Sequence, residues 1–197
     1  RSDHREVPES DEVFGKAALD LTPWDWLLAK LKYMPSFRRI NKYNSRAHAL
    51  HTTVEEDALS PQGQSFLLRK FDEGERDRQR IDLLVQWTPT DTFSATPTVG
   101  WRYDDYIRST LGLQQETSWS TGLDLNWTPV ERVSIFGGYM YENILQKQRS
   151  RSRPVVTTVP AQCPVPPCTF DFADFDWISV NTATVDTYHL GVKVCLL

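Results

Sequence analysis

Cysteine, methionine and long hydrophobic runs are all scarce in this sequence of 197 residues. Its three cysteines are too few for the disulfide framework of a small secreted domain. No run of about 18 apolar residues occurs, which excludes a transmembrane helix. A transmembrane β-barrel is not excluded, because barrel strands alternate apolar and polar residues and therefore have the mean hydropathy of a soluble protein.

Positive charge is not in excess either. The 22 Lys and Arg residues are outnumbered by 26 Asp and Glu residues, so the formal net charge is −4. A nucleic-acid-binding protein usually carries a basic footprint, and its absence predicts that nucleic acid is not a partner. The length suits one domain or one piece of a larger domain.

Two of the cysteines lie close together. Cys163 and Cys168 belong to the segment Cys-Pro-Val-Pro-Pro-Cys, whereas Cys195 stands alone near the C-terminus. No histidine follows the pair, so the C-x-x-C-H attachment of a c-type haem is absent, and a zinc site would need two further ligands. A loop disulfide in an oxidising compartment and two free thiols are both compatible with this spacing.

A short repeat organises the chain. Three alternating segments each end in Thr-Pro-x-Asp/Glu, at residues 22–25, 88–91 and 128–131, and a new alternating segment follows each time. Proline has no N–H for a strand ladder, and the acidic residue can accept turn N–H groups. The repeat therefore predicts three hairpins with short tips, and the constant spacing of the flanking apolar residues predicts one common register.

The flanks of these tips alternate with a period of two, which is the signature of β-strands. They predict an all-β, antiparallel up-and-down meander of about seven strands: 13–21, 26–34, 78–87, 92–103, 117–127, 132–143 and 185–196. The residues expected on one apolar face include Leu123, Leu125, Val133, Ile135, Val85 and Val192. The residues expected on the opposite, polar face include Asp124, Asn126, Arg80 and Arg102.

The connections at the two ends of the predicted strands differ in length. Residues 35–77 and 144–183 are expected to form long extracellular loops, with a shorter loop at 104–116. Short turns at one end and long loops at the other are typical of an outer-membrane barrel. Trp119 and Trp127 bracket an aliphatic stretch that spans ~26 Å along the strand, or ~20 Å once tilted by ~40°, which matches an apolar band between aromatic girdles.

Seven is an odd number of strands, whereas such barrels usually have an even number with both termini on the short-turn side. The chain begins with Arg1 and shows no signal peptide, so either a signal peptide has been removed or the chain begins inside a longer protein. We expect residues 1–197 to form a single β-barrel segment. Its first strand (13–21) and last strand (185–196) should not pair with each other.

Several segments together resemble the MtrB/PioB family of outer-membrane barrels. They are residues 88–95 (TPTDTFSA), 101–106 (WRYDDY), 111–125 (LGLQQETSWSTGLDL), 128–139 (TPVERVSIFGGY), 176–179 (DWIS) and 185–193 (VDTYHLGVK). The family's N-terminal Cys-x-x-Cys segment has no counterpart here, and the chain ends in Leu196-Leu197 where such barrels commonly end in an aromatic residue.

The resemblance implies the C-terminal segment of a large transmembrane barrel in the outer membrane of a Gram-negative bacterium. Members of this family sheathe a periplasmic multihaem (decahaem) c-type cytochrome and so carry electrons across the membrane. The implied partners are this cytochrome in the barrel lumen, outer-membrane lipid and, beyond the membrane, a second, extracellular multihaem cytochrome. The haem would belong to the cytochromes, so this chain would hold no cofactor and would not be an enzyme.

No catalytic, cofactor-binding or metal-binding constellation is predicted, because no nucleophile elbow, phosphate loop or H-E-x-x-H motif occurs. Two acidic groups could offer oxygen ligands to a hard cation, or could be solvated loop residues: Asp104-Asp105, and Asp171, Asp174 and Asp176. The basic run Lys147, Arg149, Arg151 and Arg153 could meet lipopolysaccharide phosphates or an acidic partner, or be solvated. His189 is expected to be a polar residue of the lumen.

Two other functions remain open from the sequence. One is a general outer-membrane porin without a redox partner, since an open lumen and an occupied lumen look alike in sequence. The other is a soluble secreted β-sheet domain that binds a ligand or polymer, since alternation alone also fits a half-exposed soluble sheet.

Overall fold

The computed structural model describes residues 7–44, 67–151 and 176–195. Within these ranges the chain forms ten β-strands. In chain order they are β1 (Ser10–Phe14), β2 (Ala17–Trp24), β3 (Leu27–Tyr33), β4 (Ser36–Ile40), β5 (Leu68–Arg69), β6 (Arg76–Thr90), β7 (Phe93–Asp105), β8 (Leu111–Val130), β9 (Val133–Arg151) and β10 (Asp176–Val194). None of the described residues forms a helix long and apolar enough to cross a membrane.

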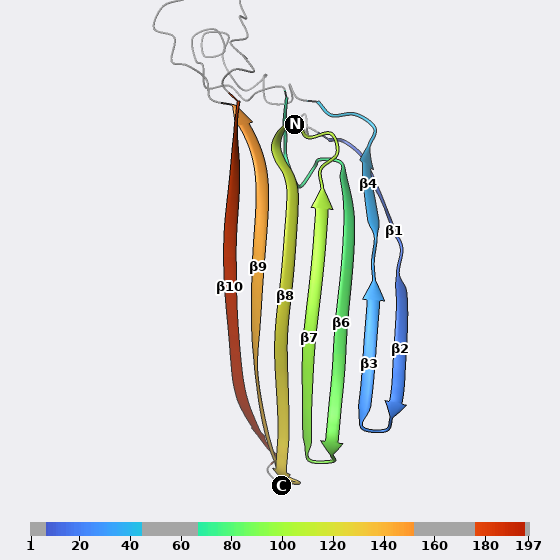
Figure 1. Ribbon diagram of the computed structural model, residues 1–197, viewed down its shortest axis with the longest axis vertical. Coiled ribbons are helices and arrows are strands. Elements are labelled where there is room, and N and C mark those ends of the chain that lie inside the picture. Colours follow the sequence, from blue (N-terminus) through green and yellow to red (C-terminus); the bar gives the residue numbers. More distant parts are fainter. Residues whose placement is uncertain (1–6, 45–66, 152–175, 196–197) are drawn as a thin grey trace, which may run out of the picture.

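The strands form one sheet in which neighbours along the chain lie side by side (Figure 1). From β6 the order runs through β7, β8 and β9 to β10, and on the other side β6 pairs with both β3 and β4, which in turn pair with β2 and β1. All these pairs are antiparallel, and only the two-residue β5 runs parallel to its neighbour, β8. The predicted antiparallel meander is therefore confirmed.

The three predicted tips lie together at one end of the sheet, between β2 and β3, β6 and β7, and β8 and β9 (Figure 1). The repeat suggested that the prolines lie in the turns, but the structure places them in the strands. Pro89 and Pro129 belong to β6 and β8, at points where the register shifts between Trp87 and Thr90 and between Trp127 and Val130. A β-bulge tolerates a residue without an N–H, and the first tip shows the same shift, so the common register of the three tips holds.

The first predicted strand is broken in two. β1 ends at Phe14 and β2 begins at Ala17, and a similar break separates β3 from β4. The two breaks face each other: the Gly15 amide donates a 2.9 Å hydrogen bond to the carbonyl of Pro35, which itself lacks an N–H. The prediction of an uninterrupted strand at 13–21 was wrong because the ladder is interrupted where Gly15 meets Pro35, whereas the strand predicted at 26–34 is present as β3.

The predicted long loops are shorter than expected because the strands extend into them. β4 and β5 lie within 35–77, β8 begins inside 104–116, and β9 and β10 take the two ends of 144–183. These extensions pair in continuous register, for example Asp176 with Arg151. The loop boundaries were placed where the apolar alternation ends, but strand pairing needs no apolar face where both faces are polar.

The sheet is a single layer, without a conventional hydrophobic core. Among the described residues the buried hydrophobic side chains are Ala95, Tyr106 and Leu111. Large apolar side chains are instead exposed along the strands, for instance Leu190 at 83 % and Val192 at 62 %. A sheet with so much uncovered apolar surface is not stable in water by itself.

The sheet is open. Among the described residues, β10 pairs with β9 alone, and no ladder joins it to β1 or β2. The expectation that the first and last strands do not pair is confirmed, and the open sheet fits a fragment of a barrel wall.

Candidate functional site

Strand alternation gives the sheet an apolar face and a polar face. Asp124 Oδ1 on β8 lies 3.3 Å from His189 Nε2 on β10, across β9 at the point where Gly138 has no side chain. The next residue, Leu125, lies on the opposite face, in a groove also lined by Trp127. The six aliphatic residues expected on the apolar face are half-buried or exposed: Leu123, Leu125, Val133, Ile135, Val85 and Val192. The predicted placement of Asp124 and Leu125 on opposite faces is confirmed.

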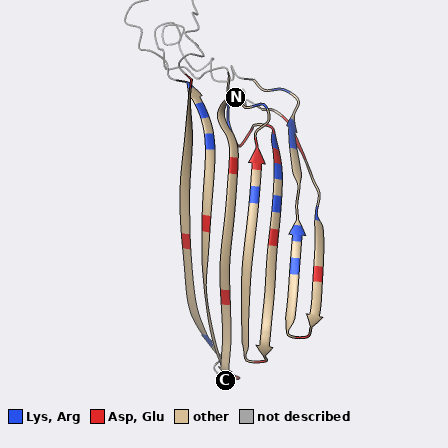
Figure 2. Ribbon diagram, in the orientation of Figure 1, with Lys and Arg blue, Asp and Glu red and all other residues tan. Residues whose placement is uncertain are grey.

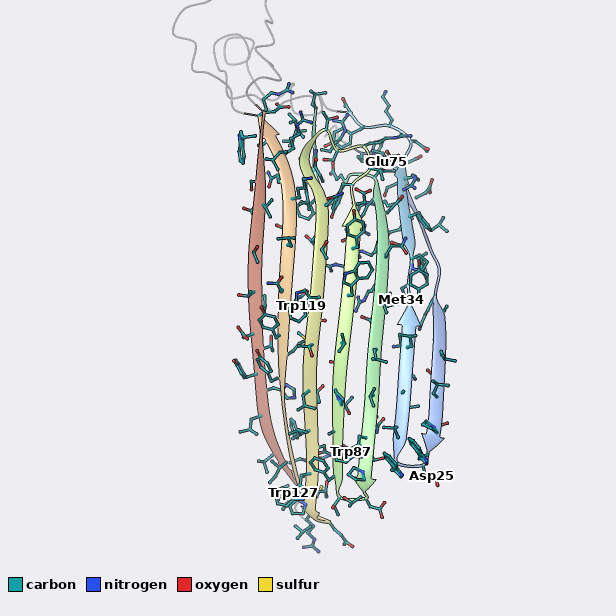
Figure 3. The ribbon with its side chains drawn as sticks, in the orientation of Figure 1. Asp25, Met34, Glu75, Trp87, Trp119 and Trp127 are labelled. Carbon is teal, nitrogen blue, oxygen red and sulfur yellow. The ribbon has the colours of Figure 1, made fainter. Side chains whose placement is uncertain are left out.

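Aromatic side chains border the apolar face at two levels. Trp119 lies about halfway along β8, and Trp127 and Trp87 lie near the tips (Figure 3). The tip-side group contains Trp24 stacked on Trp26 at 5.0 Å between ring centroids, Trp87 edge-on to Phe93 at 6.2 Å, and Trp127. The loop-side group contains the stacked pair Trp101 and Tyr103, Trp119 with Tyr141 at 5.2 Å, and Tyr139 with Tyr188 at 4.9 Å. We call these groups the tip-side girdle and the loop-side girdle.

The loop-side girdle shifts toward the tips along the ladder from β8 to β10. Trp101 and Trp119 are direct partners, but Trp119 pairs with Asn143 on β9, so Tyr141 lies two residues nearer the tips. Tyr188 pairs with Tyr139, which is two residues nearer still. Four residues of displacement over three strand spacings, at ~3.3 Å and ~4.8 Å each, correspond to a slope of about 40°. This is the tilt of strands in a membrane barrel, so the girdle follows one level of the membrane.

Charged residues gather toward the loop-side end of the sheet (Figure 2). On the polar face they form an ion-pair row along the register Arg78, Asp104, Glu116 and Gln146. Arg78 donates to both carboxylate oxygens of Asp104, at 2.6 and 2.7 Å, and Gln146 donates to Glu116 at 2.7 Å. Arg102 bridges the row, because its guanidinium lies 2.5 Å from Glu116 and 3.7 Å from Asp104. Asp104 is fully buried, and its hydrogen bonds raise the pKa of Arg78.

A second cluster continues the ion-pair row toward β1. Glu12 accepts hydrogen bonds from Ser36 and Arg76, both at 2.8 Å. The hydrogen bond from Ser36 is the main cause that lowers the pKa of Glu12. Arg38 donates to the carbonyls of Phe71, Asp72 and Gly74 at 2.6, 2.7 and 2.7 Å, and so holds residues 71–74 against the polar face.

The segment that Arg38 holds covers a small buried centre at the loop-side end. Glu75, labelled there in Figure 3, is 5 % exposed and lies 3.0 Å from Arg108. Tyr106 and Leu111 are also buried, and burial raises the pKa of Tyr106. Glu12, Arg38 and Glu75 were missed in the sequence because Glu12 precedes the predicted first strand and the other two lie in the predicted loop 35–77. The alternation of Ser36 and Arg38 with Phe37 is the signal that could have found Arg38.

Two of the acidic residues considered as cation ligands bind arginines instead. Asp104 binds Arg78, and Asp105 lies on the opposite face of β7. Asp176 binds Arg149 and Arg151, while Asp171 and Asp174 lie outside the described residues. No group of three or more His, Cys, Asp or Glu residues within the described ranges could hold a metal ion.

The remaining candidates are placed as follows. His189 is on the polar face, where its Nε2 lies 3.3 Å from Asp124 Oδ1. Cys195 is exposed as a free thiol, and Cys163, Cys168 and Arg153 lie outside the described residues.

A single-layer antiparallel sheet with a girdled apolar face, tilted strands and a polar opposite face defines the wall of an outer-membrane β-barrel. Comparison with known families agrees: residues 1–197 match the family described as "Putative outer membrane beta-barrel porin, MtrB/PioB". The chain belongs to the MtrB/PioB family, a non-enzymatic class of barrels of the outer membrane. A search of curated proteins finds no significant match. Family membership excludes the alternative of a soluble secreted β-domain.

Proposed function

We propose that this chain forms part of the wall of an outer-membrane barrel that sheathes a multihaem c-type cytochrome for electron transfer across the membrane. The cytochrome supplies the haem, and the wall supplies position and insulation from lipid.

The low relief of the polar face along β7 is the observation that carries the proposal. Between the girdle levels of β7 the polar-face residues are Ser94, Thr96, Thr98 and Gly100. At Gly100 and Gly122 an added Cβ would lie 2.7 Å from Ser120 Oγ and 2.8 Å from Thr98 Oγ1, so neighbouring hydroxyls fill the space that a side chain would take. On β7 this row of small polar groups lets a folded protein approach the wall closely between the girdle levels.

The pairing of charges on the same face also supports a protein occupant. Arg78, Arg102, Asp104 and Glu116 neutralise one another within the wall. Paired charges present little net field to the lumen, whereas a diffusion pore that selects ions usually carries unpaired rings of one sign. The loop-side end of this face is where a second, extracellular multihaem cytochrome would meet the first.

A general porin without a redox partner is the second candidate, and the porin description of the family favours it. The two functions differ in what fills the lumen. A sheath is closed to ions by its occupant, whereas a porin conducts steadily.

Purification of the tagged full-length barrel from its native membrane tests the proposal. We expect c-type haem absorbance at a fixed ratio to the barrel and little conductance in planar bilayers. The variant Thr96→Trp, which adds bulk to the polar face, should lose haem, whereas Val99→Trp on the apolar face of the same strand should retain it. Haem-free barrels that conduct steadily would instead establish the porin function.

A further inference from the structure

A basic stretch of β9 lies beyond the loop-side girdle on the outward side of the wall. Lys147, Arg149 and Arg151 have the same strand parity as Tyr141, so they share the face that meets lipid. Lys147 is six residues past Tyr141, which places it ~20 Å farther along the strand and ~15 Å farther from the membrane at a tilt of ~40°. Arg149 lies ~5 Å beyond Lys147 along the membrane normal by the same geometry.

Charges of opposite sign are separated across this part of the wall. Glu116 and Glu142 face the lumen side, where they accept hydrogen bonds from Gln146 and Ser118. On the outward side of β8 to β10 beyond the girdle, the described residues include three cations, Lys147, Arg149 and Arg151, and one anion, Asp176. The outward surface of these strands is therefore net positive, whereas Glu116 behind it is already paired with Arg102.

Asp176 arranges two of these cations. Its carboxylate accepts hydrogen bonds from Arg149 Nε at 3.0 Å and Nη2 at 2.7 Å, and from Arg151 Nη2 at 3.2 Å. These bonds, chiefly the one from Arg151, lower the pKa of Asp176 and keep it ionised. The Lys147 side chain is exposed beside them, and Arg149 retains 41 % side-chain exposure.

We infer that Lys147 and Arg149 bind phosphate groups in the saccharide core of lipopolysaccharide, ~15–20 Å outside the loop-side girdle. Basic residues beside a membrane-spanning segment recognise anionic lipid head groups, and Arg binds phosphate in a directed, multidentate way. An acidic protein is the less favoured occupant because these side chains point away from the lumen, on the face that continues the lipid-facing girdle. This inference requires only the barrel wall and is independent of the cytochrome proposal.

The test uses the full-length barrel in detergent, with divalent cations chelated, and counts lipid adducts by native mass spectrometry. The probes are lipopolysaccharide with a phosphorylated saccharide core, the same lipopolysaccharide after removal of its core phosphates, and inorganic phosphate alone. We expect the wild type to retain the phosphorylated lipid about fivefold more than the dephosphorylated one, and the double variant Lys147→Gln/Arg149→Gln to lose this preference. Inorganic phosphate alone should not displace the lipid.

The control variant Arg132→Gln/Lys193→Gln removes two charges at the tip side, one in the turn before β9 and one on β10, and should bind as the wild type does. The swap Lys147→Arg/Arg149→Lys keeps both charges and should restore the preference, which separates charge loss from misfolding. Equal retention by the double variant, or no preference for phosphate in the wild type, overturns the inference. The inference is also overturned if removing the two charges changes only the capture of an acidic protein.

Discussion

An arginine introduced at Leu123 should destabilise the barrel by an amount that its depth in the membrane determines. Leu123 lies midway between Trp119 and Trp127 on β8, about 10 Å from each girdle along the membrane normal. Its side chain is 42 % exposed on the apolar face, so Leu123→Arg places a charge against lipid acyl chains. The cost at the midplane is about 2–4 kcal/mol and falls to about 0–1 kcal/mol near the interface.

The assay is the free energy of unfolding of the full-length barrel in phospholipid vesicles, from denaturant titration. Two matched variants introduce the same residue elsewhere on β8. Thr117→Arg lies just outside the loop-side girdle and should cost about 0–1 kcal/mol. Asp124→Arg faces the lumen side beside His189 and should change the stability by within about 1 kcal/mol. A cost for Asp124→Arg equal to that of Leu123→Arg would refute the assignment of faces.

Three further predictions concern the polar face and the loop-side end. Asp104→Ala leaves Arg78 with a half-buried, unpaired charge and should lower the free energy of unfolding by about 3–5 kcal/mol, measured by the same titration, and a loss under 1 kcal/mol would contradict the ion-pair row. Gly138→Ala should destabilise the sheet because the added Cβ would overlap Asp124 Oδ1 and His189 Cε1, whereas Gly15→Ala meets Pro35 only at an ordinary 3.5 Å; equal losses for the two would contradict this packing. The pKa of Asp176 is lowered in the folded protein, so its stabilising effect is present above the unfolded pKa and is lost as the pH falls through the folded pKa. Amide exchange at the start of β10 should accordingly speed up in acid in the wild type but not in Asp176→Asn, and identical acid profiles would rule the effect out.

The alternation of apolar residues was enough to predict the membrane-spanning part of the fold. Within the girdles every strand has one face in lipid and one in a polar lumen, so a period of two is enforced and is readable from residues such as Leu123, Asp124 and Leu125. The three Thr-Pro-x-Asp/Glu repeats also predicted the positions of the hairpin tips. They recur where each strand leaves the apolar band.

The strand extensions were not predictable by that rule. Beyond Trp119 the regular apolar alternation of β8 ends, and the strand continues to Leu111 through residues such as Gln115 and Glu116. The break at Gly15 and Pro35 was also hidden, because it depends on two segments meeting across the sheet. The ion-pair row joins Arg78, Asp104 and Glu116 from three strands, and a single sequence does not reveal their common register.

The two parts of the wall are held together by different forces. Between the girdles an unpaired backbone group would face lipid, so the ladder is maintained by the cost of breaking any hydrogen bond there. The eight residues of β8 beyond Trp119, from Ser118 to Leu111, extend ~20 Å past the loop-side girdle at a tilt of ~40°, where water competes for the same backbone groups. Side-chain pairs between strands, Arg78 with Asp104 and Arg102 with Glu116, occur in this outer part of the wall. We conclude that beyond the girdle the ion-pair row stabilises the strand pairing that the lipid environment stabilises between the girdles. Weakening the ion-pair row should therefore open the loop-side end while the spanning part of the ladder persists.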